Sequence, residues 1–304
     1  MARVFVLGGV NVDRVWRLGA PLHAGRRNIF GAVTRRIGGG GFNTACALDA
    51  LGHEVVIATS LADDRAGRAC CRALRDLGFD TSQVVFRRER TVPTEIFVDP
   101  AGERTIVVPA SIETRLPNWD LQAIEADLAY VALRRTDPSG LAKLLGRMDV
   151  VAQIPVDVGE RRPATVLIGS SSDLNVSSLR DPFDHARRLA GSSLRHFVLT
   201  DGPRPVQVWD AHGRASIEVT ARPPASDTTG AGDVFAAGFI DAYLRGDALE
   251  ETIRHASGVA GLFLSDRTAF IDGRAQRPRS DPRSADLVDM TQVDAARARK
   301  TMTF

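Results

Sequence analysis

Short apolar runs alternate with helical patterns along most of this 304-residue chain. Runs rich in β-branched residues predict strands at 4–7, 54–58, 128–133, 150–154, 165–168 and 196–200. Apolar positions at helical spacing predict helices at 43–51, 66–77, 234–244, 248–264 and 291–299. This alternation predicts an α/β fold, a mainly parallel sheet with helices on both faces. Binding groups in such folds gather at the carboxyl ends of the strands.

Two segments break the alternation. Residues 15–37 mix apolar and polar side chains without a helical period, and residues 91–110 contain two β-rich runs around the turn 99–103. Both predict antiparallel strands outside the main sheet. We expect these strands to form a small β lid inserted in a single domain over 1–304. An edge extension of the main sheet with no part in ligand closure would give the same pattern.

The composition excludes several classes of protein. A net charge of +2 gives no reason to expect nucleic acid or a membrane as partner, and no apolar run approaches the roughly 20 residues of a membrane helix. The cysteines Cys46, Cys70 and Cys71 are too few for a disulfide framework and match no zinc spacing. The N-terminal apolar run is too short for a signal peptide, so we expect a cytoplasmic protein.

The most informative motif is the heptapeptide Asp-Thr-Thr-Gly-Ala-Gly-Asp at 227–233, which leads directly into an apolar helix. The N–H groups of Gly230, Ala231 and Gly232 would lie at the helix N-terminus, where unpaired donors and the helix dipole hold anions. The carboxylate of Asp233 would lie beside such an anion. Together these groups predict phosphoryl transfer, with Asp233 taking a proton from the attacking hydroxyl. A buried helix capped by ordinary turn residues would explain the same sequence without a ligand.

A second glycine-rich stretch at 38–41 joins the first lid segment to the helix that contains Asn43. Four consecutive glycines indicate a close approach by a ligand or another backbone, or a structural turn. The first strand is followed by Gly-Gly-Val-Asn-Val-Asp at 8–13, where Asn11 and Asp13 would face the same side of an extended chain. They are either a pair of polar groups for a ligand or ordinary turn formers.

These motifs carry a resemblance to a known family. The heptapeptide at 227–233 resembles the C-terminal signature of the ribokinase-like (PfkB) carbohydrate kinases, and residues 38–43 resemble their N-terminal signature. The strand and turn at 196–205 are similar to the family segment that lines the nucleotide site. The resemblance implies a three-layer αβα fold with a β lid, and an ATP-dependent kinase in which Mg²⁺ accompanies ATP.

The resemblance also implies roles for single residues. Asp233 would be the catalytic base beside the anion hole formed by Gly230, Ala231 and Gly232. Substrate hydroxyl groups would be bound by Asn11, Asp13, Gly39, Gly40 and Asn43. The nucleotide would contact Thr200, Gly202, Thr228, Gly230 and Gly232. The remaining pair, Asp227 and Thr229, would help to bind a monovalent cation such as K⁺.

Three positions depart from the family pattern. Members usually carry Asn-x-x-Glu in mid-chain to position magnesium, but the nearest frame here is 172–175, whose end residues are uncharged, although Asp173 could compensate. Some sugar kinases place an acid near 133–135, where Arg134 and Arg135 indicate either a more acidic substrate or a surface position. In the nucleotide-site turn, Pro205 replaces the last glycine.

The predicted reaction is transfer of the γ-phosphoryl group of ATP to a hydroxyl of a monosaccharide or nucleoside. A sugar phosphate is an alternative acceptor, because Arg26, Arg27, Arg35 and Arg36 of the lid could hold a second phosphate, although a solvated face explains them too. A sugar or nucleotide sensor without turnover is the other alternative, motivated by the lost Asn-x-x-Glu. The edge strands of the lid could also pair with a second copy and form a homodimer.

Overall fold

The computed structural model describes residues 1–87, 89–110, 119, 121–155, 157, 159–174, 178–219, 227–267 and 270, except for the side chain of residue 122. The helix expected at 291–299 lies outside these residues.

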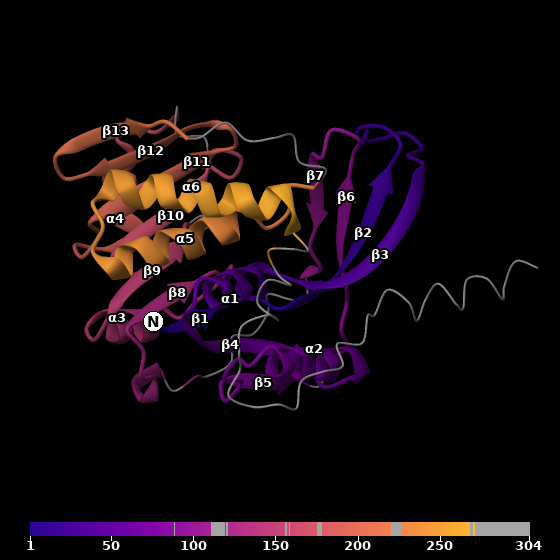
Figure 1. Cartoon of the computed structure of the whole chain (residues 1–304), viewed down its shortest axis with the longest axis horizontal. Helices are drawn as coiled ribbons and strands as arrows, with labels where there is room; N and C mark the ends of the chain where they lie inside the picture. The colour runs from indigo at the N-terminus through magenta and orange to yellow at the C-terminus, as the bar shows by residue number, and fades with distance from the viewer. Residues whose placement is uncertain are drawn as a thin grey trace, which may run out of the picture.

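A nine-stranded sheet forms the centre of the molecule (Figure 1). Its strand order is β13-β12-β11-β10-β9-β8-β1-β4-β5. The strands from β11 to β5 pair in parallel, while β12 and β13 continue one edge as antiparallel strands. The bounds are β1 Arg3–Leu7, β4 Glu54–Ala62, β5 Val84–Arg87, β8 Leu128–Val131, β9 Asp149–Gln153, β10 Val166–Ser170, β11 His196–Asp201, β12 Arg204–Asp210 and β13 Gly213–Ile217.

Helices cover both faces of this sheet, which confirms the predicted α/β class. Alternate residues of β1 point to opposite faces, as the strand period requires: Val4 and Val6 join one core cluster, and Phe5 and Leu7 the other. The first cluster includes α1 (Gly40–Ala50), α2 (Arg65–Asp76), α5 (Ala231–Arg245) and α6 (Leu249–Ser265). The second includes α3 (Pro138–Leu145) and α4 (Pro182–Ala190). The molecule is therefore three layers thick at its centre.

A separate four-stranded sheet stands to one side of these layers (Figure 1). Its order is β3-β2-β6-β7, with β2 Asn11–Leu18, β3 Phe30–Gly38, β6 Thr94–Val98 and β7 Arg104–Val107. The expectation of purely antiparallel strands is wrong at the centre, where β2 and β6 pair in parallel. The reason is that two hairpins, β2–β3 and β6–β7, lie side by side with their first strands adjacent.

Each strand expected in the main sheet overlaps a strand of the structure, and the helices expected at 43–51, 66–77, 234–244 and 248–264 correspond to α1, α2, α5 and α6. Two further helices, α3 and α4, were not predicted, although both carry a start signal. Each begins at a proline preceded by an aspartate, and the carboxylates of Asp137 and Asp181 accept hydrogen bonds from backbone N–H groups of the first turn. Their shortness hid the helical period.

Candidate active site

The heptapeptide forms a tight turn at the start of α5. Gly230 is the N-cap residue, with φ of 86° in the left-handed region that favours glycine. An added Cβ on Gly230 would lie 2.9 Å from Asn43 Nδ2, so this position also lacks space for a side chain. The Ala231 N–H donates to Thr228 O at 3.2 Å. The expectation of three free donors therefore needs correction, because the turn itself already uses the Ala231 N–H.

The N-termini of α1 and α5 meet at Asp233. The Asn43 Nδ2 donates to Asp233 Oδ2 at 2.9 Å, and the Thr44 Oγ1 donates to the backbone oxygen of Asp233 at 3.1 Å. A Cβ on Gly40 would lie 3.0 Å from Asp233 Oδ1, so glycine leaves room for this carboxylate. Asn43 was expected to contact substrate, but in the structure its amide holds the carboxylate of Asp233.

The environment of Asp233 makes its carboxyl group a stronger base. Burial raises its pKa above the ordinary value for aspartate, against the opposing effects of the Asn43 hydrogen bond and of the positive charges of Arg104 and Arg267. A carboxylate with a raised pKa holds a proton more readily, which is what a general base near neutral pH requires.

Asp13 lies buried in β2, with 3% of its surface exposed. In the sheet register it is paired with Arg36 of β3, and a Cβ on Gly38 would lie 1.8 Å from Asp13 Oδ2. Burial raises the pKa of Asp13 to about 6, an effect that Arg36 opposes and Asp233 reinforces. The glycine run thus gives space to two carboxylates, Asp13 at Gly38 and Asp233 at Gly40.

Asn11 and Gly39 lie beside the loop that follows β1. Gly39 has φ of 96°, and a Cβ there would lie 2.5 Å from Gly9 O. Asn11 lines a cavity of about 110 Å³ together with Gly9, Leu133 and Trp119. Asp13 is not among the described residues that line this cavity. The extended chain expected at Asn11 and Asp13 after the first strand belongs to β2 of the small sheet, and of the two residues Asn11 alone lines this cavity among the described residues.

Three arginines surround Asp227, whose side chain is only 9% exposed. The distances to Asp227 Oδ2 are 3.0 Å from Arg36 Nη1, 3.7 Å from Arg17 Nη2 and 3.6 Å from Arg267 Nη1. Burial alone would raise the pKa of Asp227, but contacts with Thr229, Arg36 and Arg267 outweigh it and lower the pKa. The sequence drew attention to Arg36, whereas Arg17 and Arg267 were missed because only the tertiary fold brings them here.

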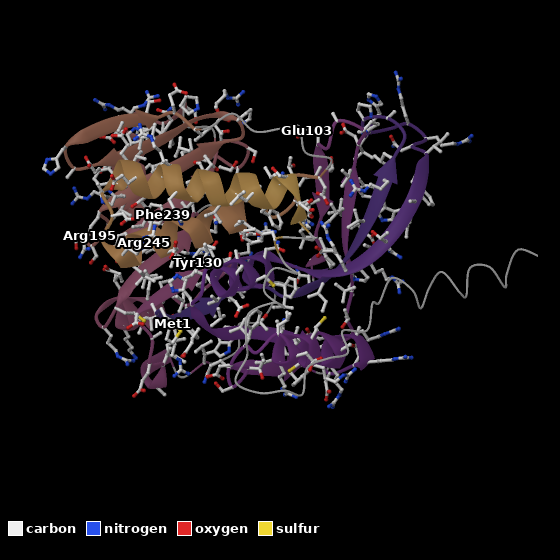
Figure 2. The ribbon with its side chains drawn as sticks, in the orientation of Figure 1. Met1, Glu103, Tyr130, Arg195, Phe239 and Arg245 are labelled. Atoms are coloured by element: carbon white, nitrogen blue, oxygen red, sulfur yellow. The ribbon has the colours of Figure 1, made fainter. Side chains whose placement is uncertain are left out.

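The small sheet touches the heptapeptide through the β6–β7 turn. The Arg104 Nη1 donates to Thr228 Oγ1 at 2.8 Å, and the Thr228 Oγ1 donates to Gly102 O at 3.3 Å. In Figure 2, Glu103 marks this turn, on the side of the small sheet that faces the larger one. Thr228, expected to bind nucleotide, is thus in contact with the predicted lid.

The expected nucleotide side lies at the carboxyl end of β11. Thr200 is half-buried there, and its Oγ1 donates to Gly169 O at 3.1 Å. Gly202 follows in a turn with φ of 56°, and Pro205 falls inside β12 rather than in the turn. Asp173 is exposed in the turn after β10, close to β11 through the hydrogen bond from Ser171 N to Thr200 O. Asn175 lies outside the described residues.

The departure at 133–135 is a surface feature. Arg134 and Arg135 are exposed, and both pair with Asp157, at 2.7 and 3.2 Å. These contacts favour the surface interpretation over an acidic substrate. Cys46, Cys70 and Cys71 are buried, and none of the three forms a disulfide with a described residue. Among the described residues, no helix is long and apolar enough to cross a membrane.

Comparison with known proteins identifies the family. The model of the pfkB family carbohydrate kinases matches residues 1–134 and 164–271. The chain belongs to this family. It is therefore a phosphotransferase with an alcohol group as acceptor, and the family implies ATP as the phosphoryl donor.

Curated relatives of similar length are named for three substrate classes: a sugar, a nucleoside and a sugar phosphate. Ribokinase from Haemophilus influenzae is 25% identical over 87% of this chain and 92% of its own length. Guanosine-inosine kinase from Exiguobacterium acetylicum is 25% identical over 87% of this chain and 95% of its own. ATP-dependent ribose-1-phosphate kinase from Halopiger xanaduensis is 26% identical over 94% and 98%. Kinases of sugars, nucleosides and a sugar phosphate are thus all represented among the relatives.

The fold comparison agrees. The crystal structure of ribokinase from Cryptococcus neoformans in complex with ADP superposes with a TM-score of 0.70 at 19% identity, covering 91% of this chain and all of that one. At this identity the likeness concerns the fold, and it confirms the predicted ribokinase-like architecture.

Proposed function

We propose that this protein transfers the γ-phosphoryl group of ATP to a hydroxyl group of a monosaccharide or a nucleoside, with Asp233 as the base. The observation that carries the proposal is the set of contacts around Asp233. Asn43 fixes one carboxylate oxygen, and Gly40 keeps space beside the other. A carboxylate held in this way, in the first turn of a helix, can accept a proton next to a bound anion.

The reaction needs one proton acceptor and a set of donors for the transferring group. The acceptor hydroxyl loses its proton to Asp233 Oδ1 as its oxygen attacks the γ-phosphorus, and the bond from that phosphorus to the departing ADP oxygen breaks. The N–H groups of Gly230 and Gly232 stabilise the charge on the phosphoryl oxygens. The Ala231 N–H already donates to Thr228 O, and it would donate to a phosphoryl oxygen as well, as a bifurcated hydrogen bond. The chemistry is mainly positioning and charge stabilisation.

We propose that Asp13, Asn11 and Gly39 bind the hydroxyl groups of the substrate through hydrogen bonds. The charged form of Asp13 is disfavoured by burial. Hydrogen bonds from substrate hydroxyls favour that charged form, so a polyol would bind Asp13 as a carboxylate. Thr200, Gly202 and Thr228 are the proposed nucleotide contacts.

Magnesium is expected with ATP, and the exposed carboxylate of Asp173 fits a site shared with the phosphates of ATP. Mg²⁺ is commonly held by one or two carboxylates together with substrate phosphates. No group of three or more His, Cys, Asp or Glu side chains within the described ranges could hold a metal. We assign Asp173, exposed beside the end of β11, as the carboxylate that would hold Mg²⁺, which neutralises phosphate charge when bound.

A screen for ADP release across sugars, nucleosides and sugar phosphates tests the proposed function. We expect turnover with at least one sugar or nucleoside and a phosphorylated product by mass spectrometry. Binding of such compounds, seen as a thermal shift, without ADP release in Mg²⁺ would instead support the sensor alternative.

A sugar phosphate is the second candidate acceptor, and Arg36 is the observation that favours it. Its Nη2 is buried without a hydrogen-bond partner among the described residues, whereas Arg26, Arg27 and Arg35 are exposed. A phosphate could pair with this nitrogen. Turnover of phosphosugars alone, with KM raised about tenfold or more in Arg36→Ala but not in its exposed neighbour Arg35→Ala, would favour this acceptor.

A further inference from the structure

The guanidinium of Arg267 bridges the two residues that the family resemblance assigns to a monovalent cation. Its Nη1 lies 3.6 Å from Asp227 Oδ2, and its Nη2 donates to the backbone oxygen of Thr229. Arg267 follows α6, whose C-terminal end reaches the small sheet (Figure 1). The guanidinium lies 4.7 Å from the ring centroid of Phe263, which fixes it from one side. The two oxygens expected to bind K⁺ thus already have a cation.

The surrounding charges oppose a second cation. Arg17 and Arg36 also approach the carboxylate of Asp227, so three guanidinium groups face one buried carboxylate. Two further carboxylates, Asp13 and Asp233, lie within electrostatic range of Arg267. An added K⁺ at Asp227 would meet three positive charges at the group that should attract it. The residues present therefore do not fit the expected K⁺ site.

The contact with Thr229 O has a consequence for the proposed anion hole. The carbonyl of Thr229 and the N–H of Gly230 belong to one planar trans peptide, so they point in opposite directions. A positive group that holds the oxygen on one side directs the N–H to the other side. Arg267 thereby acts on a donor of the transferring phosphoryl group without touching it.

We infer that Arg267 is a built-in cation of the phosphoryl-transfer site, which makes turnover independent of K⁺. The inference rests on the proposed function, because it assigns Gly230 to the anion hole. Guanidinium suits the role, since it is weakly hydrated and presents several donors in a fixed plane. Burial lowers the pKa of Arg267 to about 10, so the group stays charged at neutral pH. Arg267 is a positioning residue, since it acts through the Thr229–Gly230 peptide.

Cation dependence of the unmodified enzyme is the first test. ADP release is measured with the best acceptor substrate in KCl, NaCl and choline chloride, each at about 0.1 M. The three salts then have the same ionic strength and screen the charges of the site equally. We expect kcat to differ by less than about twofold and the Tm to be insensitive to K⁺. Activation by K⁺ of about fivefold or more, the usual lower range for a coupled effector, would overturn the inference. Absence of ADP release with every acceptor would instead defeat the proposed function.

Variants of Arg267 give the second test, with Arg254→Ala as a control because Arg254 pairs only with Glu250 on the exposed face of α6 among the described contacts. We expect Arg267→Ala to lose kcat about tenfold or more with little change in KM for ATP, and to regain part of it in K⁺ or guanidinium. Arg267→Lys should retain most of the activity. Unchanged kcat in Arg267→Ala, or a loss that no cation restores in a folded variant, would contradict the inference.

Discussion

The nine-stranded sheet is packed on both faces, whereas the hydrophobic cluster of the four-stranded sheet comprises, among the described residues, three buried apolar side chains: Val15, Ile96 and Val98. Its edge strand β7 is exposed along its whole length. The difference separates two kinds of functional group. Asp233 belongs to a helix embedded in the large core, while Arg17, Arg36 and Arg104 come from the small sheet. Packing in the large core thus fixes the proposed base, Asp233, whereas the small sheet supplies positively charged side chains near the heptapeptide.

The contacts between the small sheet and the heptapeptide are polar. Arg36 pairs with Asp227, and Arg104 donates to Thr228. Such contacts can break and form again without exposing a large apolar core, so a sheet that is locally less stable is suited to opening and closing. We therefore propose that opening and closing of the expected lid would move the small sheet, and not the strand ends that carry the proposed nucleotide contacts.

Core truncations should show the largest difference between the two sheets. Phe239 of α5, labelled in Figure 2, is fully buried, whereas Ile106 of β7 is 44% exposed. Phe239→Ala should lower the free energy of unfolding by about 3–5 kcal/mol. Ile106→Ala should change it by no more than about 0.5 kcal/mol. Denaturant unfolding measures both changes in the free energy of unfolding. Equal losses in the two variants would contradict the difference in packing between the two sheets.

Asp13 should show a pH-dependent conflict between stability and function. Its pKa is raised from 3.8 to about 6 in the folded protein, so the folded state binds more protons and stability falls as pH rises between these values. Asp13→Asn should therefore stabilise the protein at pH 8 by about 1–3 kcal/mol and have little effect below pH 4. Unfolding measured across this range should show a flatter profile for the variant, together with a large rise in KM for the acceptor.

A substitution at Gly40 tests whether turnover needs the space beside the proposed base, Asp233. An added Cβ would lie 3.0 Å from Asp233 Oδ1, so Gly40→Ala should displace the carboxylate and reduce kcat by about 10–100-fold. Gly258→Ala is the control, because nothing lies within 4 Å of an added Cβ at that helical position. The control should keep its kcat and gain up to about 1 kcal/mol of stability. Equal kcat in both variants would show that the space beside Oδ1 has no functional role.

The smallest effect is expected at the lid contact. Arg104→Ala removes the hydrogen bond to Thr228 and should raise KM for ATP or acceptor by about two- to tenfold with unchanged stability. Glu103→Ala, at the exposed neighbouring position, should leave both constants unchanged. Identical kinetics of the two variants would argue against a lid that closes on the heptapeptide.

The parts of the fold and site that were predictable from the sequence are local in the chain. The heptapeptide carries its own turn, cap and carboxylate, and the strands of the parallel sheet are continuous apolar runs because both faces are buried.

The role of Asn43 as a partner of Asp233 was not predictable in this way, because it depends on two helix N-termini that meet across 190 positions of sequence.

The parts that were not predictable depend on long-range contacts. Arg17, Arg36 and Arg267 come from two lid strands and from the end of α6, and no local pattern marks them as neighbours of Asp227. The same reason hid the parallel pairing of β2 with β6, since the pairing of two hairpins is set by their packing. The inference that Arg267 takes the place of a bound cation at Asp227 therefore needed the tertiary structure.

The proposed transfer of the acceptor's proton to Asp233 can be tested by comparing this residue with another aspartate of α5. Asp241 is buried eight residues further along the same helix, where it contacts His53 and Arg245. Asp233→Asn should keep its Tm and ATP binding but lose kcat by about 10²–10⁴-fold, whereas Asp241→Asn should lower the Tm and keep kcat within a few-fold. Near-normal kcat for ADP release in Asp233→Asn would show that Asp233 is not the base.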